Sequence, residues 1–386
     1  MQIYLDYSAS TPTRPEAIAA MQDAMKQQWG NPSSLHYWGN RSATVLERSR
    51  QQIANLINAA SADSIVFTAG GSEADNLAIL GTAQNYVRPQ HVIISDVEHS
   101  AISEPAKLLA RSGWQVTRLP VDAQGSVDPQ QLAEAIQPNT AIISIIYGQS
   151  EVGTLQPIAE LGAIAQSRGV LFHTDAVQAA GRLPIDVQQL PIDFLSLSSH
   201  KIYGPQGAGA LYIKPGLPRP LPIIAGGGQE SGLRSGTQAL PNIAGFGIAA
   251  ELAVEEMPAE TVRLIHLRDR LFSLLADVDA LEPTGHPRHR LPHHVSFCLP
   301  YENITGKALV RQMNLAGIGI SAGSACHSGQ LSPSPILKAM GYSDKAAKSG
   351  IRLTLGRQTT EADIDWAALV LKQVVARSLA TTPIGV

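Results

Sequence analysis

Short apolar runs alternate with amphipathic segments through much of the chain. The runs at residues 64–67, 92–94 and 141–146 are typical of strands, and helical spacing of apolar positions follows each of them. An earlier segment, about residues 41–57, also has its apolar positions at helical spacing. Continuous apolar strands between helices indicate a mostly parallel sheet that helices cover on both faces. The pattern therefore predicts an α/β fold.

The alternation ends near Tyr212 and Ile213, and a stretch rich in proline and glycine follows at residues 215–228. Beyond it, the pattern predicts helices over about residues 241–256 and 260–276, and then a mixture of short strands and helices. We expect a domain boundary near residue 256. A large domain would cover residues 14–255, and a smaller α+β domain would cover residues 256–386.

Composition excludes several classes of protein. The formal net charge is only −3 at pH 7, so no basic surface for nucleic acid is indicated. No apolar run could span a bilayer, and the first residues lack a signal-peptide pattern. The two cysteines, Cys298 and Cys326, are too few for a disulfide framework or a multi-cysteine zinc site. A reducing cytoplasm is the expected compartment.

An acid and a lysine follow two successive strand-like runs. Residues 170–172 lead to Asp175, and residues 193–197 lead to Lys201, ahead of a Gly-Pro break. A lysine at such a position can form an imine with a carbonyl cofactor, and an acid can keep a pyridinium nitrogen protonated. An isolated lysine would more simply be a solvated surface residue. The pair instead indicates pyridoxal 5′-phosphate (PLP).

Further motifs lie along nearly the whole chain. They are Tyr4–Ala9, Gly30–Ser34, Glu98-His99, His200–Pro205, Arg234–Thr237, Ser324–Cys326 and Ile351–Arg357. In this order they resemble the cysteine desulfurases of the NifS/IscS-like group, which are PLP enzymes of the class V aminotransferase superfamily. Each motif alone is a weak signal, whereas the ordered set is strong. The resemblance implies a fold-type I PLP-dependent transferase in which residues 1–13 pack with the small domain.

A Gly-rich turn before a predicted helix suits the cofactor phosphate, because the N–H groups of a helix start bind anions. We expect Gly71 and Ser72 to hold the phosphate, with Ser72 as the helix N-cap. The resemblance adds Ser198 and His200 to this phosphate site. It also brings Thr237 from a second subunit, which implies a homodimer.

The resemblance assigns the rest of the cofactor contacts. His99 would stack on the pyridine ring, Asp175 would pair with the ring nitrogen, and Gln178 would bond the ring oxygen. Lys201 would hold the cofactor as an imine and then move protons as base and acid.

Substrate chemistry rests on two further residues. Arg352, in an apolar strand, needs an anionic partner, either an internal carboxylate or a bound one. The resemblance favours the α-carboxylate of an amino acid. It assigns Cys326 the attack on the substrate sulfur, on a mobile loop (about residues 321–335) similar to that of group I desulfurases. Cys298, between two apolar neighbours, is expected to be an inert core residue.

Two segments depart from simple expectations. Where the family usually has a histidine and two asparagines, this chain has Tyr147, Gln149 and Ser150. The contact that the second asparagine makes to the cofactor and substrate is then lost, or moves to Gln149 or water. The histidine-rich residues 285–294 are expected to form a basic loop that faces solvent or a partner, and no metal site is predicted.

The predicted function is that of a homodimeric cysteine desulfurase. It would convert L-cysteine to L-alanine and pass sulfur through a Cys326 persulfide to an iron–sulfur scaffold or another acceptor. The alternatives are a selenocysteine lyase or other PLP-dependent C–S lyase, and a catalytically weak partner protein that keeps the fold. Neither a nucleic acid nor a membrane is an expected partner.

Overall fold

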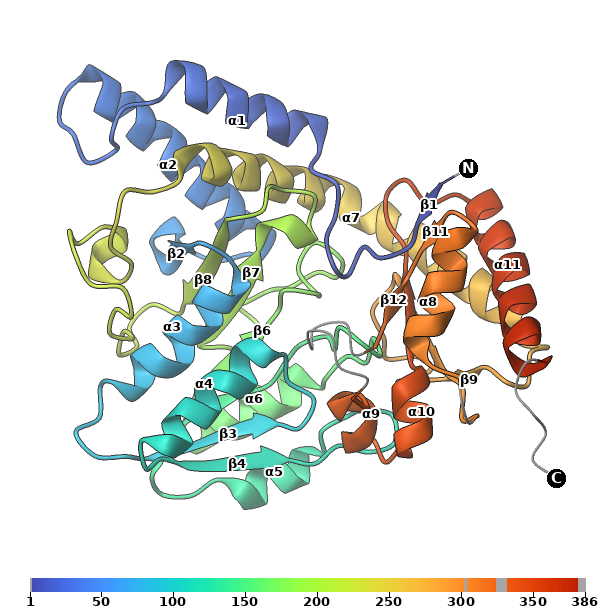
Figure 1. Cartoon of the computed structure of the whole chain (residues 1–386). Helices are drawn as coiled ribbons and strands as arrows, with labels where there is room; N and C mark the ends of the chain where they lie inside the picture. Colours follow the sequence, from blue (N-terminus) through green and yellow to red (C-terminus); the bar gives the residue numbers. More distant parts are fainter. Residues whose placement is uncertain (1, 302–303, 324–331, 381–386) are drawn as a thin grey trace.

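The computed structural model describes residues 2–301, 304–323 and 332–380 of the chain. Figure 1 shows a larger sheet flanked by helices and, beside it, a smaller group of strands and helices built from both ends of the chain. One long helix, α7 (Leu240–Leu275), runs from the first group into the second.

The larger sheet has seven strands in the order β2-β8-β7-β6-β5-β3-β4. Only β8 runs antiparallel to its neighbours, so the prediction of a mostly parallel sheet is confirmed. The strands are β2 (Ile65–Thr68), β3 (His91–Ser95), β4 (Gln115–Leu119), β5 (Thr140–Ser144), β6 (Leu171–Asp175), β7 (Phe194–Ser198) and β8 (Gly209–Ile213).

Helices cover this sheet on both faces, and each face has its own apolar core. One core contains residues of α2, α5, α6 and the first half of α7, and the other contains residues of α3 and α4. The helices are α1 (Pro15–Gln27), α2 (Tyr37–Leu56), α3 (Gly71–Ala83), α4 (Ser100–Arg111), α5 (Pro129–Ala135) and α6 (Ile158–Ser167). Short 3₁₀ turns are η1 (Ala62–Ser64), η2 (Ser199–Lys201) and η3 (Glu230–Gly232).

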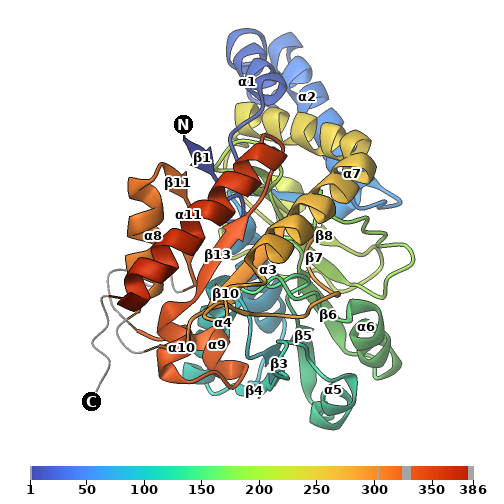
Figure 2. The ribbon, with the colours of Figure 1, turned by 90° about the vertical axis from the view of Figure 1, so that its right-hand side faces the viewer.

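The smaller group forms around the sheet β12-β13-β10-β9, and β1 pairs in parallel with β11. The N-terminal strand therefore lies among C-terminal elements. Figure 2 shows α11 beside the second half of α7, and both supply residues to the core here. The elements are β1 (Ile3–Tyr4), β9 (Glu282–Pro283), β10 (His294–Cys298), α8 (Gly306–Leu315), β11 (Ile318–Gly319), β12 (Ser321–Ala322), α9 (Pro335–Ala339), α10 (Asp344–Ser349), β13 (Ile351–Thr354) and α11 (Glu361–Ala380).

The two helices expected at 241–256 and 260–276 are a single helix in the structure. α7 continues through Pro258, which the sequence pattern treated as a break. Its buried residues end at Ala253 on the side of the larger sheet and resume at Leu264 in the smaller core. The polar residues between them mark a change of packing partner and not an end of the helix. The division at residue 256 stays a prediction, and it falls inside this helix.

None of the described helices combines the length and the apolar character that crossing a membrane requires.

The second half of α7 offers a direct test of the smaller core. Leu267 is 2% exposed, whereas Val262 on the same helix is 68% exposed. We expect Leu267→Ala to lower the free energy of unfolding by about 2–5 kcal/mol, because it leaves a cavity. The control, Val262→Ala, should change it by about 0.5 kcal/mol or less. Urea unfolding measures both, and equal small effects would contradict the packing of α7 described above.

Candidate active site

The predicted acid and lysine lie at the ends of two neighbouring strands. Asp175 closes β6, and it is paired in parallel register with Ser196 of β7. β7 ends at Ser198, and η2 carries Lys201 immediately beyond it. Burial raises the pKa of Asp175, while the nearby His99 and Lys201 act to lower it. The structure thus brings three of the predicted residues, Asp175, Lys201 and His99, into one electrostatic environment.

Two main-chain carbonyl groups hold the amine of Lys201. Its Nζ donates to the oxygen of Ser8 at 2.6 Å and to that of Ala9 at 2.9 Å. Gln178 Nε2 donates to the same Ser8 oxygen at 2.9 Å. His293 Nε2 also lies 3.1 Å from Ser8 Oγ. The N-terminal segment therefore lies against Lys201, which hydropathy alone does not reveal.

The Gly-rich turn presents bare backbone next to the end of β7. α3 begins at Gly71, where an added Cβ would lie 2.7 Å from Val177 Cγ2 and 3.5 Å from Ser198 Cβ. The N-cap is Gly70, so the prediction of Ser72 as N-cap is wrong. Ser72 is the second residue of the helix and is exposed. β2 ends at Thr68, and Gly70 has an extended backbone, so the helix starts two residues earlier than a Ser72 N-cap would place it.

Two histidines flank the site. His99 is the N-cap of α4, and its Nδ1 accepts from the Ala101 N–H at 3.1 Å. This contact fixes the plane of the imidazole at the end of β3. His200 Nδ1 lies 3.2 Å from Ser10 Oγ, and burial lowers the pKa of His200 to about 4. His200 is therefore neutral at physiological pH, and any contact it makes to a phosphate is a hydrogen bond without a formal charge.

Glu98 adds a buried acid next to His99. Its Oε1 accepts from Ser95 Oγ at 2.5 Å and from the Ile146 N–H at 2.9 Å. Burial raises the pKa of Glu98 to about 8, and the charge of Asp175 acts in the same direction. Sequence reasoning used Glu98 only as part of a motif, because burial of a residue beside a turn cannot be read from spacing.

Arg352 has an internal acidic partner. On β13, its Nη2 donates to Asp6 Oδ1 at 2.7 Å, and its Nη1 donates to the Ser150 carbonyl oxygen at 2.8 Å. Of the two partners expected for Arg352, the structure contains the internal carboxylate. Ser150 takes part through its backbone, and His294 Nε2 lies 3.2 Å from the same carbonyl oxygen.

Comparison with known proteins places the chain in a family. The family model for aminotransferase class-V matches residues 3–366. The chain belongs to the class-V aminotransferase family. It is 41% identical to "Cysteine desulfurase IscS" of Dictyoglomus turgidum, over 99% of this chain and 96% of that protein. It is 40% identical to "Cysteine desulfurase IscS 1" of Archaeoglobus fulgidus, over 99% of each chain.

Solved structures of similar proteins agree with the fold. A "NIFS-LIKE PROTEIN" superposes with a TM-score of 0.90 at 32% identity, covering 98% of this chain and 100% of the other. The NifS-like protein from Rickettsia africae gives a TM-score of 0.88 at 30% identity, with 97% and 100% covered. The fold is therefore that of a fold-type I PLP-dependent enzyme, as the sequence predicts.

Pyridoxal phosphate is the cofactor of this family, and the described residues fit it. Gly71 leaves the start of α3 without a side chain beside Ser198, where a phosphate can approach backbone N–H groups. Asp175 is a buried acid suited to a ring nitrogen, and Lys201 supplies the amine. The specific contacts of these residues with the cofactor, and those of Ser72, Gln178, His99 and His200, stay predictions.

In the segment at residues 147–150, which departs from the family pattern, the side chain of Gln149 stabilises the backbone. Its Oε1 accepts from the N–H groups of Glu151 and Val152, and its Nε2 donates to the Val97 oxygen at 3.4 Å. Gln149 is 2% exposed. Its amide therefore shapes the turn at residues 149–152, so of the alternatives for the missing asparagine contact its loss and its transfer to water remain.

Thr237 is exposed on the surface of the chain. Arg234, three residues earlier, ties this segment to the first turn of α3, since its Nε donates to Glu73 Oε1 at 2.8 Å. The role of Thr237 across a subunit interface stays a prediction.

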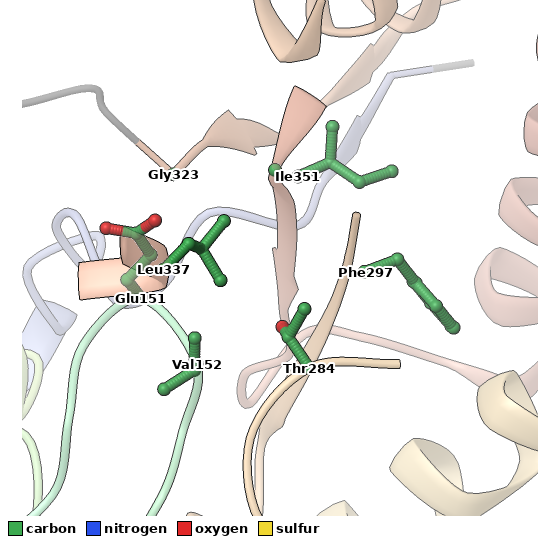
Figure 3. A pocket seen from close by; sticks show the side chains of 8 residues that line it. Glu151, Val152, Thr284, Phe297, Gly323, Leu337 and Ile351 are labelled. Atoms are coloured by element: carbon green, nitrogen blue, oxygen red, sulfur yellow. The ribbon is translucent and has the colours of Figure 1, made fainter. Parts of the chain in front are cut away.

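Cys326 lies outside the described residues. The described chain ends on this side at Gly323, whose N–H donates to the Gly350 oxygen at 3.0 Å. Figure 3 shows the carboxylate of Glu151 close to Gly323 and Leu337. The turn shaped by Gln149 therefore contacts the end of β12, from which the chain continues toward Cys326. Cys298 is fully buried as predicted, and burial raises its pKa to about 12.

The expectation of a solvent-facing histidine-rich loop is wrong for part of residues 285–294. His293 and His294 are fully buried, and Arg290 is 4% exposed. His294 opens β10 and His293 directly precedes it, next to the smaller core, while Arg290 pairs with Thr154 in an isolated bridge. Among the described residues, no group of three or more His, Cys, Asp or Glu side chains is arranged to hold a metal ion.

Gly71 provides a test of the phosphate turn. In Gly71→Ala, the new Cβ would press on Val177, two residues after Asp175, and move the helix start. We expect the dissociation constant of pyridoxal phosphate to rise by about tenfold or more, because a helix-start anion site depends on close backbone approach. Absorbance titration of cofactor-free protein measures it, and the control is Gly319→Ala on β11, where an added Cβ would make only ordinary contacts, the nearest to Tyr4 Cδ2 at 3.6 Å. An unchanged affinity in Gly71→Ala would place the phosphate elsewhere.

Proposed function

We propose that this chain is a cysteine desulfurase, which converts L-cysteine to L-alanine and transfers the sulfur to Cys326 as a persulfide. The observation that carries the proposal is the placement of Asp175 and Lys201 at adjacent strand ends, with His99 acting on the same acid. The two relatives described above support the same reaction, because both are named cysteine desulfurases and this chain matches almost their full length.

The residues of the chain divide the work between them. When bound, the cofactor withdraws electrons from the α- and β-carbons of an amino acid, so that its C–S bond can break. The Asp175 carboxylate would keep the ring nitrogen protonated, and His99 would lie against the ring. Lys201 would hold the cofactor through its amine, and that amine, once free, would take and return protons at Nζ. The Ser8 and Ala9 oxygens orient that amine.

The sulfur step needs a thiolate and leaves a carbanion. The Sγ thiolate of Cys326 attacks the sulfur of the substrate thiol, so that an S–S bond forms while the C–S bond breaks. The bonding electron pair stays on the β-carbon, and the substrate thiol gives up its proton or retains it on the new persulfide. A proton delivered to the β-carbon then completes the methyl group of alanine.

Arg352 is proposed to bind the α-carboxylate of the substrate. Its Nη1 donates one N–H to the Ser150 oxygen, and its Nη2 donates one N–H to Asp6. Each of these nitrogens carries a second N–H that can bind another acceptor. Asp6 balances the buried positive charge before a substrate arrives. Ser150, whose carbonyl orients the guanidinium, is thereby part of the proposed substrate site.

We also propose a homodimer in which Thr237 of each subunit reaches the phosphate site of the other. Large apolar side chains lie exposed near the α1–α2 connection: Trp29 is 67%, Tyr37 is 65% and Trp38 is 49% exposed. A patch of this kind is typical of a surface that another chain covers. Sedimentation should give a species of twice the 41.0 kDa chain mass, and a stable monomer would contradict the proposal.

Delivery of sulfur to an iron–sulfur scaffold or another acceptor in the cytoplasm is the further part of this proposal. Transfer of labelled sulfur from the persulfide to a purified scaffold protein tests it. Label that stays on the enzyme would argue for a different acceptor.

The two cysteines of the chain allow a matched test of the reaction. Cys326→Ser should abolish persulfide on the protein after incubation with L-cysteine, because the acceptor sulfur is gone. Cys298→Ser should keep it, since Cys298 is fully buried and its thiol pKa is raised to about 12. Mass spectrometry of the intact protein measures both. Alanine release and persulfide formation that persist in Cys326→Ser would favour a C–S lyase without a thiol acceptor.

A further inference from the structure

A second acid is buried behind Asp175, and the reaction proposed above does not use it. Asp75 lies one turn after Gly71 on α3 and is 1% exposed. The charge of Asp175 acts on it directly. α3 therefore carries both Gly71, which is predicted to hold the phosphate, and the buried carboxyl group of Asp75, which lies close to Asp175.

Three polar side chains form a hydrogen-bonded row beside Asp75, and we call them the polar row: Ser144, His173 and Ser196. They come from the neighbouring strands β5, β6 and β7, and all three are fully buried. His173 Nδ1 lies 2.8 Å from Ser144 Oγ, and its Nε2 lies 2.9 Å from Ser196 Oγ. Asp75 joins the row through a hydrogen bond with Ser196, and its Oδ1 is 3.6 Å from His173 Nε2.

The charge of Asp75 decides the direction of every bond in the polar row. If Asp75 is neutral, its O–H donates to Ser196, Ser196 donates to His173 Nε2, and the Nδ1–H of His173 donates to Ser144. If Asp75 is ionised, Ser196 donates to Asp75, and each later bond reverses. Both arrangements satisfy the geometry, because a hydroxyl and a neutral imidazole can each donate and accept.

The surroundings of Asp75 favour the neutral form. Burial raises its pKa well above 3.8, and the charges of Asp175 and Glu98 act in the same direction, against the hydrogen bond with Ser196, which acts to lower the pKa. His173 offers no compensating charge, because burial lowers its pKa to about 3. Asp75 Oδ1 also makes no hydrogen bond within the described part of the chain. An ionised carboxylate in this position would lack a cation and keep a bare oxygen.

Asp175 has the opposite surroundings, since His99 and Lys201 both stabilise its charged form. Two acids whose environments differ in this way divide their protons unequally. We propose that Asp75 is a neutral, proton-bearing positioning residue, whose O–H directs the polar row and leaves Asp175 as the ionised partner of the cofactor ring. This inference rests on the proposed contact between Asp175 and the ring nitrogen.

The first test is spectroscopic and uses the cofactor-loaded enzyme. Asp75→Asn keeps the shape of the side chain and is neutral at every pH. If Asp75 is already neutral, the visible absorption of the bound cofactor and its pH midpoint should match those of the unmodified enzyme. A midpoint shift of about half a pH unit or more would mean that a charge had been removed, which would overturn the proposal.

The second test uses stability, and the sign follows from proton binding. A folded-state pKa above the unfolded value means that the folded enzyme binds the extra proton, so stability is lost as the pH rises. Asp75→Asn removes this loss. Relative to the unmodified enzyme, its unfolding constant in urea should therefore fall by about tenfold per pH unit upward from about pH 5. A difference that does not grow with pH would contradict a neutral Asp75.

Two further variants keep the outcomes distinct. Asp75→Ala should show the same pH slope as Asp75→Asn, although the void lowers its stability at every pH, so a fragile variant remains informative. Asp175→Asn should weaken cofactor binding and alter its absorption. If Asp175→Asn changes neither, the assignment of Asp175 to the ring nitrogen fails, whereas the slope of Asp75→Asn still decides whether Asp75 carries a proton.

Discussion

The parallel pairing of β6 with β7 is the constraint on which the site depends. Because Asp175 is in register with Ser196, the acid at the end of β6 lies next to the residues that close β7 and lead to Lys201. The carboxyl ends of parallel strands are the usual place for a ligand in such a sheet. A slip of one residue would turn Asp175 to the other face and separate the acid from the amine.

The site also depends on how buried charge is distributed. His99 and Lys201 act to lower the pKa of Asp175, and Arg352 is balanced by Asp6. Burial raises the pKa values of Asp75, Glu98 and Asp175 alike, but at Asp175 the nearby His99 and Lys201 oppose this effect. The N-terminal segment links the two parts of the site. Its Asp6 accepts a hydrogen bond from Arg352, and its Ser8 oxygen accepts one from Lys201.

The sequence predicted features that depend on neighbouring residues, and it could not predict contacts between residues that are far apart in the chain. Asp175 and Lys201 each follow an apolar run, so local patterning places them at strand ends. The continuity of α7 through Pro258 depends on a change of packing partner, and the burial of His294 depends on a distant strand pairing, so neither has a local signal. The pair Arg352–Asp6 joins residues 346 positions apart in the chain, and spacing could only require some anion.

The central claim is that Lys201 holds the cofactor and moves the protons of the reaction. The most direct measurement is the visible absorption of purified Lys201→Ala, together with alanine formation from L-cysteine. The account predicts a folded protein without the cofactor band of the unmodified enzyme and without turnover. A variant that keeps both the band and the activity would contradict the account.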